Sequence, residues 1–290
     1  MHRAPGLLLV ALAAALLATA CGDDTDRART GASDVLEVTA GFYPYAFVAE
    51  RVGGDDVTVT NLAASGAEPH DLELSPRQVG ALQETDLVLY SKGFQPAVDE
   101  AVEQSASDRA LDVLEAVELR EGDPHVWLDP VRLSTIAGAV ADRLGELSPE
   151  RAGDFERRAL ELSAGLKELD GELQRGLADC ARTQLVTSHD AFGYLADAYG
   201  LEQVPLSGLS PEDEASPKRL AEVARYAKEQ GVTTIFFEDL VSPKVAESLA
   251  REVGATATAL NPLEGPPDVG DYLTEMRANL EVLRTALDCG

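Results

Sequence analysis

Apolar positions along most of the chain alternate between short continuous runs, typical of buried strands, and helically spaced positions, typical of amphipathic helices. The segments with strand character are 35–40, 57–62, 87–90, 184–187, 233–237 and 255–260. The segments with helical character are 42–52, one opened by Ser75-Pro76, 130–147, 191–199, 217–230, one opened by Ser242-Pro243, and 270–287. Strands that alternate with helices predict parallel sheets covered on both faces, which is the α/β class.

One helical segment is much longer than the others and runs from Ser148-Pro149 to about residue 179. About 30 residues at 1.5 Å per residue give a rod of about 45 Å, the length of a whole domain. We therefore predict two lobes, 34–147 and 180–290, each with a mainly parallel sheet flanked by helices. The long helix 148–179 would join them.

The first 21 residues are organised like an export signal. Arg3 precedes an aliphatic run of about 14 residues, Leu7 to Ala20, which is too short to span a bilayer as a helix. The run ends in Ala-Thr-Ala-Cys at 18–21, which resembles a bacterial lipobox. The resemblance implies cleavage before Cys21, a lipid on its thiol and a flexible tether over 22–33, so that the mature chain is anchored outside the cytoplasm. The alternative is an ordinary cleaved signal that leaves a free cysteine.

The two remaining cysteines, Cys180 and Cys289, form an even pair in a chain expected outside the cytoplasm. Disulfides persist in that environment, so we predict a bond between them. It would tie the C-terminal helix to the start of the second lobe. Two zinc thiolates are the alternative, but neither cysteine lies in a CxxC spacing.

The chain is strongly acidic, with 51 acidic against 24 basic residues and a formal net charge of −27. Such a surface repels nucleic acid and anionic lipid headgroups and concentrates cations. It would also simply keep the chain soluble. We therefore expect no nucleic-acid partner, a monomer, and membrane contact through the lipid anchor only.

The chain contains four histidines, and His2 lies within the export signal. His70, His125 and His189 all lie in predicted loops that precede helices. Ligands of open α/β sheets gather at the carboxyl ends of the strands, which would bring His70 and His189 together between the lobes. Neutral imidazoles are good Zn²⁺ ligands, although a single loop histidine is more often solvated or hydrogen-bonded, so the residues alone leave both interpretations open. The neighbouring carboxylates that could orient the rings are Asp71, Asp123 and Asp190.

Several motifs resemble those of the metal-specific solute-binding proteins of bacterial ABC importers, the cluster A-I group that takes up zinc or manganese. The motifs are AEPHD at 67–71, DPHVWLDP at 123–130, LVTSHDAFGY at 185–194, SPKRL at 216–220 and IFFEDLVSPK at 235–244. The resemblance, strongest to the zinc-uptake members, implies two α/β lobes with the metal held between them by His70, His125 and His189. It implies a zinc-binding protein that delivers its ion to an import permease and is not an enzyme. Manganese-type members carry a carboxylate where this chain has His189, and nitrogen in place of oxygen favours zinc.

The fourth ligand stays open, because the chain has Asn261 where many relatives have an aspartate ligand. An amide is a poorer Zn²⁺ ligand than a carboxylate, and Asn261 before a proline also fits a turn residue. Water could complete the site. The candidate side chains are Asn261, Glu68, Glu238 and Asp239.

Three other functions remain as alternatives to zinc delivery. A manganese or mixed-metal carrier is one, because the histidine-rich loop of many zinc members is missing between Gly93 and His125. A zinc hydrolase is another, but no HExxH helix occurs, and the sequence neighbours Ser188-His189-Asp190 rarely achieve the geometry of a catalytic triad. An adhesin or scaffold with a structural metal is the third.

Overall fold

The structure, a computed structural model, describes residues 35–290 except 64, 121, 212 and 241. The expected export signal, Cys21 and the tether lie outside the described residues. The described residues form one compact unit. It contains two four-stranded sheets, in both of which all neighbouring strands are parallel. Within the described residues, no helix is both long and apolar enough to cross a membrane.

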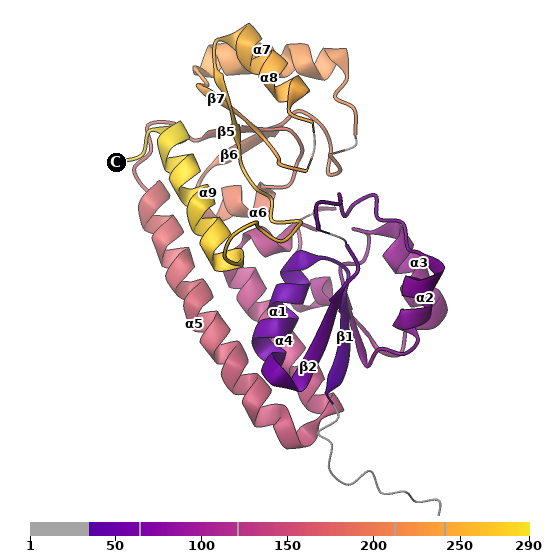
Figure 1. Cartoon of the computed structure of the whole chain (residues 1–290). Coiled ribbons are helices and arrows are strands. Elements are labelled where there is room, and N and C mark those ends of the chain that lie inside the picture. The colour runs from indigo at the N-terminus through magenta and orange to yellow at the C-terminus, as the bar shows by residue number, and fades with distance from the viewer. Residues whose placement is uncertain (1–34, 64, 121, 212, 241) are drawn as a thin grey trace, which may run out of the picture. The chain divides into compact units, whose positions relative to one another are not determined.

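The first sheet has the strand order β2-β1-β3-β4 and is accompanied by the N-terminal helices (Figure 1). Its strands are β1 (Leu36–Ala40), β2 (Val57–Asn61), β3 (Leu87–Tyr90) and β4 (Ala110–Asp112). The helices are α1 (Tyr43–Gly53), α2 (Pro76–Leu82), α3 (Pro96–Ser105) and α4 (Pro130–Leu147), with 3-10 turns η1 (Gly54–Asp56), η2 (Val113–Ala116) and η3 (Val126–Leu128). Helix α4 begins as its Asp-Pro sequence predicts, since the Asp129 side chain accepts from the Val131 N–H at 2.8 Å.

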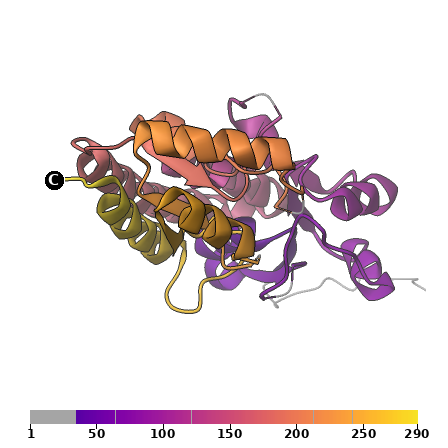
Figure 2. The ribbon, with the colours of Figure 1, turned by 90° about the horizontal axis from the view of Figure 1, so that it is seen from above.

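The second sheet repeats this arrangement with the order β6-β5-β7-β8. Its strands are β5 (Gln184–Thr187), β6 (Glu202–Pro205), β7 (Thr234–Phe237) and β8 (Thr256–Ala259). The helices are α6 (Gly193–Tyr199), α7 (Pro217–Gln230), α8 (Lys244–Val253) and α9 (Tyr272–Leu287). Seen from above, α7 and α8 lie together over this sheet (Figure 2). In each sheet the strand that comes first in the sequence lies between the second and the third. Strand β1 lies between β2 and β3, and β5 lies between β6 and β7.

A long helix, α5 (Ala152–Leu177), lies between the two halves of the sequence and follows a 3-10 turn, η4 (Pro149–Arg151). Its 26 residues extend over about 39 Å at 1.5 Å per residue. It contacts α1 and α4 of the first half and α6 and α9 of the second, so it touches helices of both halves. The α/β class and the two parallel sheets predicted from the sequence are confirmed, and the long helix is slightly shorter than expected.

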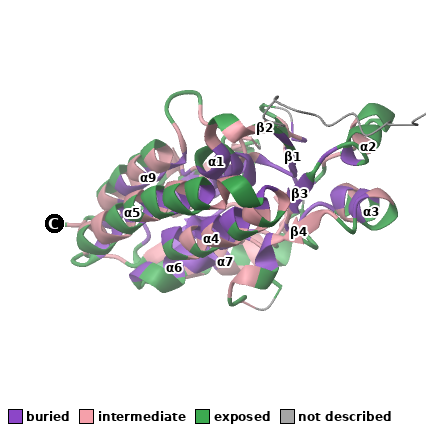
Figure 3. Ribbon diagram, turned by 90° about the horizontal axis from the view of Figure 1, so that it is seen from below, coloured by how far each residue is buried: buried purple, intermediate pink, exposed green. Residues whose placement is uncertain are grey.

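One hydrophobic core runs through both halves of the molecule. It includes buried residues of β1 and α1, the inward face of α5, and residues of α6 and α9. Figure 3 shows the matching pattern, with buried residues on β1 and β3 and both buried and exposed residues on α4 and α5. Two smaller clusters lie under α2 and α3 and under α7 and α8. The helices α4, α5 and α9 therefore connect the two sheets through continuous apolar packing.

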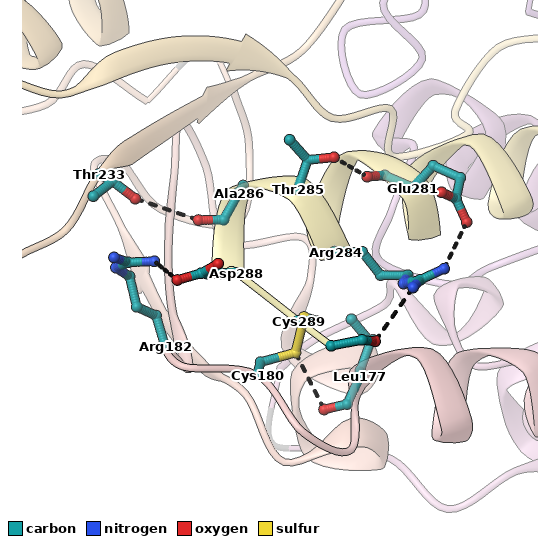
Figure 4. Close-up of a disulfide and its surroundings, with 11 residues drawn as sticks. Leu177, Cys180, Arg182, Thr233, Glu281, Arg284, Thr285, Ala286, Asp288 and Cys289 are labelled. Atoms are coloured by element: carbon teal, nitrogen blue, oxygen red, sulfur yellow. Dashed lines mark hydrogen bonds and ion pairs between the residues drawn. A yellow bond between two sulfur atoms is a disulfide. The ribbon is translucent and has the colours of Figure 1, made fainter.

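Cys180 and Cys289 form a disulfide in the structure (Figure 4). The two cysteines also pair as an antiparallel β-bridge. The Arg182 N–H donates to the Leu287 carbonyl at 3.1 Å just beyond it. The bond thereby joins the end of α9 to the segment between α5 and β5, as the sequence predicts.

Candidate metal centre

Four side chains from separate loops meet at one point between the two sheets. His70 follows β2, His189 follows β5 and Glu264 follows β8, so all three lie beyond the carboxyl ends of parallel strands. His125 comes directly before the 3-10 turn η3, which leads into α4. One potential ligand atom from each of these residues lies within 4.8 Å of the others.

The centre of this cluster is the carboxylate of Glu264. Its Oε1 atom lies 3.3 Å from His70 Nε2, 3.6 Å from His125 Nε2 and 3.5 Å from His189 Nε2. Glu264 is 1% exposed, His125 and His189 are fully buried, and His70 is 9% exposed. The Nε2 atoms of His125 and His189 and the Oε2 atom of Glu264 are buried without a hydrogen-bond partner, although buried polar atoms are normally paired.

These distances match the dimensions of a zinc site. Four ligands that surround Zn²⁺ tetrahedrally at 2.0–2.1 Å lie about 3.3–3.4 Å from one another. The three Oε1-to-nitrogen separations, 3.3 to 3.6 Å, are close to this value. The unpaired buried atoms would gain their partner in such an ion, so three imidazoles and one carboxylate fit Zn²⁺ as a bound cargo.

Two further carboxylates hold the far sides of the imidazole rings. Asp123 Oδ1 lies 2.8 Å from His125 Nδ1 and also accepts from the His125 backbone N–H at 2.9 Å. Glu238, directly after β7, places its Oε1 atom 2.6 Å from His189 Nδ1 and accepts from the Ser188 hydroxyl. Such contacts fix the tautomer and the direction of each ring, leaving Nε2 as the free ligand atom.

The surroundings shift the protonation of the histidines in opposite directions. Burial lowers the pKa of His125, against the effect of Asp123, so this ring is held neutral. Burial also disfavours the charged form of His189, but the carboxylates of Glu238 and Glu264 outweigh it and raise the pKa of His189 to about 10. Burial raises the pKa of Glu264, yet the adjoining imidazoles of His189 and His70 bring it down to about 2. In the metal-free protein a proton on His189 thus balances the charge of Glu264.

The candidates for a fourth ligand lie at different distances from this centre. Glu68 accepts from the His70 backbone N–H at 3.1 Å, and burial together with the charge of Glu264 raises the pKa of Glu68 to about 8. Glu238 touches the outer nitrogen of His189, and the exposed Asp239 lines a surface hollow together with Asn261. Asn261 makes its side-chain bonds within its own turn and to Glu275.

Sequence reasoning missed Glu264, which stands three residues after Asn261 in the same loop. The rule that ligands follow the carboxyl ends of strands applies to it, because β8 ends shortly before. Glu264 also follows Pro262-Leu263 and precedes a glycine, which are unusually apolar neighbours for a charged residue. This was the feature of the sequence that could have identified Glu264 as a ligand. Of the neighbouring aspartates expected to orient the rings, Asp123 does so, whereas Glu238 takes that place at His189 instead of Asp190.

The chain is similar to known proteins in family, in sequence and in structure. The model of the family "Zinc-uptake complex component A periplasmic" matches residues 38–286. The high-affinity zinc uptake system protein ZnuA of Bacillus subtilis is 33% identical, and the match covers 97% of both chains. The zinc-binding protein AdcA of Streptococcus pyogenes is also 33% identical over 87% of this chain, which spans only 56% of that longer protein. Among solved structures, the laminin-binding protein Lmb of Streptococcus agalactiae, described as bifunctional with adhesin and metal transporting activity, has a TM-score of 0.81 at 34% identity, over 87% of this chain and 99% of that one.

Proposed function

Because this chain belongs to the family of periplasmic zinc-uptake complex components, we propose that it binds Zn²⁺ outside the cytoplasm and delivers it to the permease of an ABC importer. The observation that carries the proposal is the meeting of four buried ligand atoms, from His70, His125, His189 and Glu264, within 4.8 Å. Loops of both sheets contribute, so the ion would be enclosed between the halves of the molecule.

The donor set supports zinc as the cargo. Three imidazole nitrogens and one carboxylate oxygen suit a tetrahedral, borderline-soft ion, whereas Mn²⁺ prefers more oxygen ligands and a higher coordination number. Glu264 and the two outer carboxylates, Glu238 and Asp123, also surround the site with the negative charge that a divalent cation requires.

The same arrangement argues for carriage rather than catalysis. A hydrolytic zinc centre keeps one coordination position open for water or substrate. Here Glu264 approaches all three histidines from that fourth direction, and the side chains are almost completely buried. We therefore propose that the protein binds and transfers the ion without chemical change.

A competition titration of metal-stripped protein, residues 22–290, with Zn²⁺ and Mn²⁺ tests this function. We expect one zinc ion per chain with a sub-micromolar dissociation constant and far weaker manganese binding. Equal or tighter manganese binding would show that zinc is not the cargo. Hydrolysis of ester or peptide substrates by the zinc-loaded protein would contradict the carrier role.

Glu238→Gln is expected to weaken zinc binding by about 10- to 100-fold, because the carboxylate that orients His189 and raises its basicity loses its charge. Isothermal titration with a competing chelator measures the change. Asp190→Asn is the matched control, since Asp190 is the next residue after His189, and the described residues show no hydrogen bond or ion pair between its carboxylate and the His189 ring. An equal loss in both variants would contradict a specific role of Glu238.

Zinc affinity should fall by about tenfold for each unit that the pH is lowered from 8 to 6, because Zn²⁺ must displace a proton from His189. The sign follows from the pKa of His189, which lies near 10 in the metal-free protein, so the ring is protonated throughout this range. Burial lowers the pKa of His125, so this ring competes less for protons than His189 does. Chelator competition at several pH values measures the slope, and an affinity independent of pH would contradict this assignment of the proton.

We also propose that Cys21 carries the lipid anchor, on the strength of the lipobox-like residues 18–21. Fractionation of cells that express the full chain tests the anchor. Cys21→Ser should move the protein from the membrane fraction to the soluble extracytoplasmic fraction. Unchanged membrane association would remove Cys21 as the attachment site.

A further inference from the structure

The loop that carries Glu264 is fixed by two asparagines. Asn279, on α9 and only 3% exposed, accepts from the Asn261 backbone N–H at 3.0 Å and donates to the Asn261 carbonyl at 2.7 Å. The side chain of Asn261 in turn accepts from the Leu263 N–H at 2.8 Å and donates to Glu275 Oε1 at 3.1 Å. Every hydrogen-bonding group of Asn261 is thus used to hold the loop.

The turn closed by Asn261 forces an unfavourable backbone conformation immediately before the ligand. Leu263 has a φ of 55° and is completely buried. Within the described residues only Asp288 shares such a positive φ outside glycine, and this region of the backbone is unfavourable for a residue with a large side chain. The bond from Leu263 to the Asn261 side chain holds this conformation, after which Glu264 points toward the histidines.

The same loop is tied to the segment that carries His125. The indole Nε1–H of the fully buried Trp127 donates to the Pro262 carbonyl at 2.7 Å. Tyr272, at the start of α9, donates its hydroxyl to the Trp127 carbonyl at 2.6 Å. One chain of hydrogen bonds therefore sets the position of Glu264 relative to His125.

We propose that Asn261 and Asn279 are positioning residues, which place the Glu264 carboxylate in the zinc site without binding the ion themselves. This inference rests on the proposed function, because it assumes that the four-residue centre binds zinc. It also gives a reason for an asparagine at 261: an aspartate there would set a second carboxylate 3.1 Å from Glu275 Oε1, where the amide now donates a hydrogen bond.

The effect of Asn261→Asp on zinc affinity distinguishes a positioning residue from a ligand, because the two roles predict changes in opposite directions. If residue 261 bound the metal, Asn261→Asp would tighten zinc binding, because a carboxylate is the better ligand. As a positioning residue, Asn261→Asp should weaken it through repulsion from Glu275. Asn261→Asp combined with Glu275→Gln should restore it, since the new glutamine amide can donate to the new carboxylate. Glu275→Gln alone is the matched control and should bind as the unchanged protein does.

The experiment measures zinc affinity by chelator competition and the visible absorption of the Co²⁺-loaded protein, which reports coordination number. We expect Asn261→Ala and Asn261→Asp to lower zinc affinity by about 10- to 100-fold. Both should replace the tetrahedral cobalt spectrum by a weaker one, because displacement of Glu264 lets more than one water bind and raises the coordination number. The double variant should regain both properties. Circular dichroism of the metal-free variants shows that they are folded.

Three outcomes would overturn the inference. They are tighter binding by Asn261→Asp, zinc affinity and cobalt spectrum of Asn261→Ala unchanged from the parent protein, or a double variant as weak as Asn261→Asp. In each case the parent protein still binds zinc, so the proposed function would stand. A parent protein that binds no zinc would instead overturn both the function and the positioning role.

Discussion

Glu264→Ala is expected to weaken zinc binding by at least about 100-fold, equivalent to about 2.7 kcal/mol of binding free energy. Glu264 is the only carboxylate whose oxygen lies within 3.6 Å of the Nε2 atoms of all three histidines among the described residues. Its removal leaves a buried site of three neutral ligands without a negative charge in contact with the ion. The loss should exceed that of any variant that only orients a ligand.

Two controls show whether the effect belongs to this carboxylate. Asp239→Asn changes an exposed acid that the sequence suggests as an alternative fourth ligand, and it should leave the affinity unchanged. Glu264→Gln keeps the size of the side chain and should lie between the parent protein and Glu264→Ala. If Asp239→Asn costs as much as Glu264→Ala, or if Glu264→Ala binds zinc normally, the proposed four-residue centre is wrong.

Loss of the disulfide is expected to lower the free energy of unfolding by about 2–4 kcal/mol. The bond joins residues 109 positions apart, so its loss releases a long loop in the unfolded chain, for which the chain-entropy model gives about 4–5 kcal/mol. The double variant Cys180→Ser/Cys289→Ser, compared with the parent protein by urea unfolding, measures the difference.

The zinc affinity of the same double variant shows whether Cys180 and Cys289 serve as a structural disulfide or as zinc ligands. The cysteines are bonded to each other in the structure, and the four-residue centre contains neither. The double variant should therefore bind one zinc ion with an affinity within tenfold of the parent protein. A loss of zinc together with unchanged stability would favour the thiolates, and a reducing agent should destabilise the parent protein but not the variant.

The sequence predicts the fold well wherever an element has a clear hydrophobic period. Strands β3 and β5 have the predicted bounds, and α4 and α7 begin at the Asp-Pro and Ser-Pro pairs that predict them. Strands β4 and β6 and helix α3 were not predicted from the sequence. Strand β6 reads Glu-Gln-Val-Pro and β4 has three residues, so neither shows an apolar run, and both form because neighbouring strands offer hydrogen bonds at the sheet edge.

The site was predictable only in part, for a different reason. The histidines stand in recognisable loops, and the structure brings His70, His125 and His189 together, although their role as ligands remains a proposal. Glu264 was not predicted as a ligand because its position depends on the positive φ of Leu263 and on hydrogen bonds from α9 and Trp127. Both of these partners are far away in the sequence. The family resemblance pointed to Asn261 instead, because many relatives have an aspartate ligand at that position, whereas here Asn261 makes the turn.

The apolar core that runs from β1 through α5 to α6 and α9 makes the two halves depend on each other for folding. A fragment that ends after α5 would expose the face that α9 covers, and a fragment that starts at β5 would leave the buried side of α6 and α9 in water. Neither half should be obtainable alone as a soluble folded protein. Heating should accordingly give a single calorimetric transition, with both sheets lost together rather than in two steps.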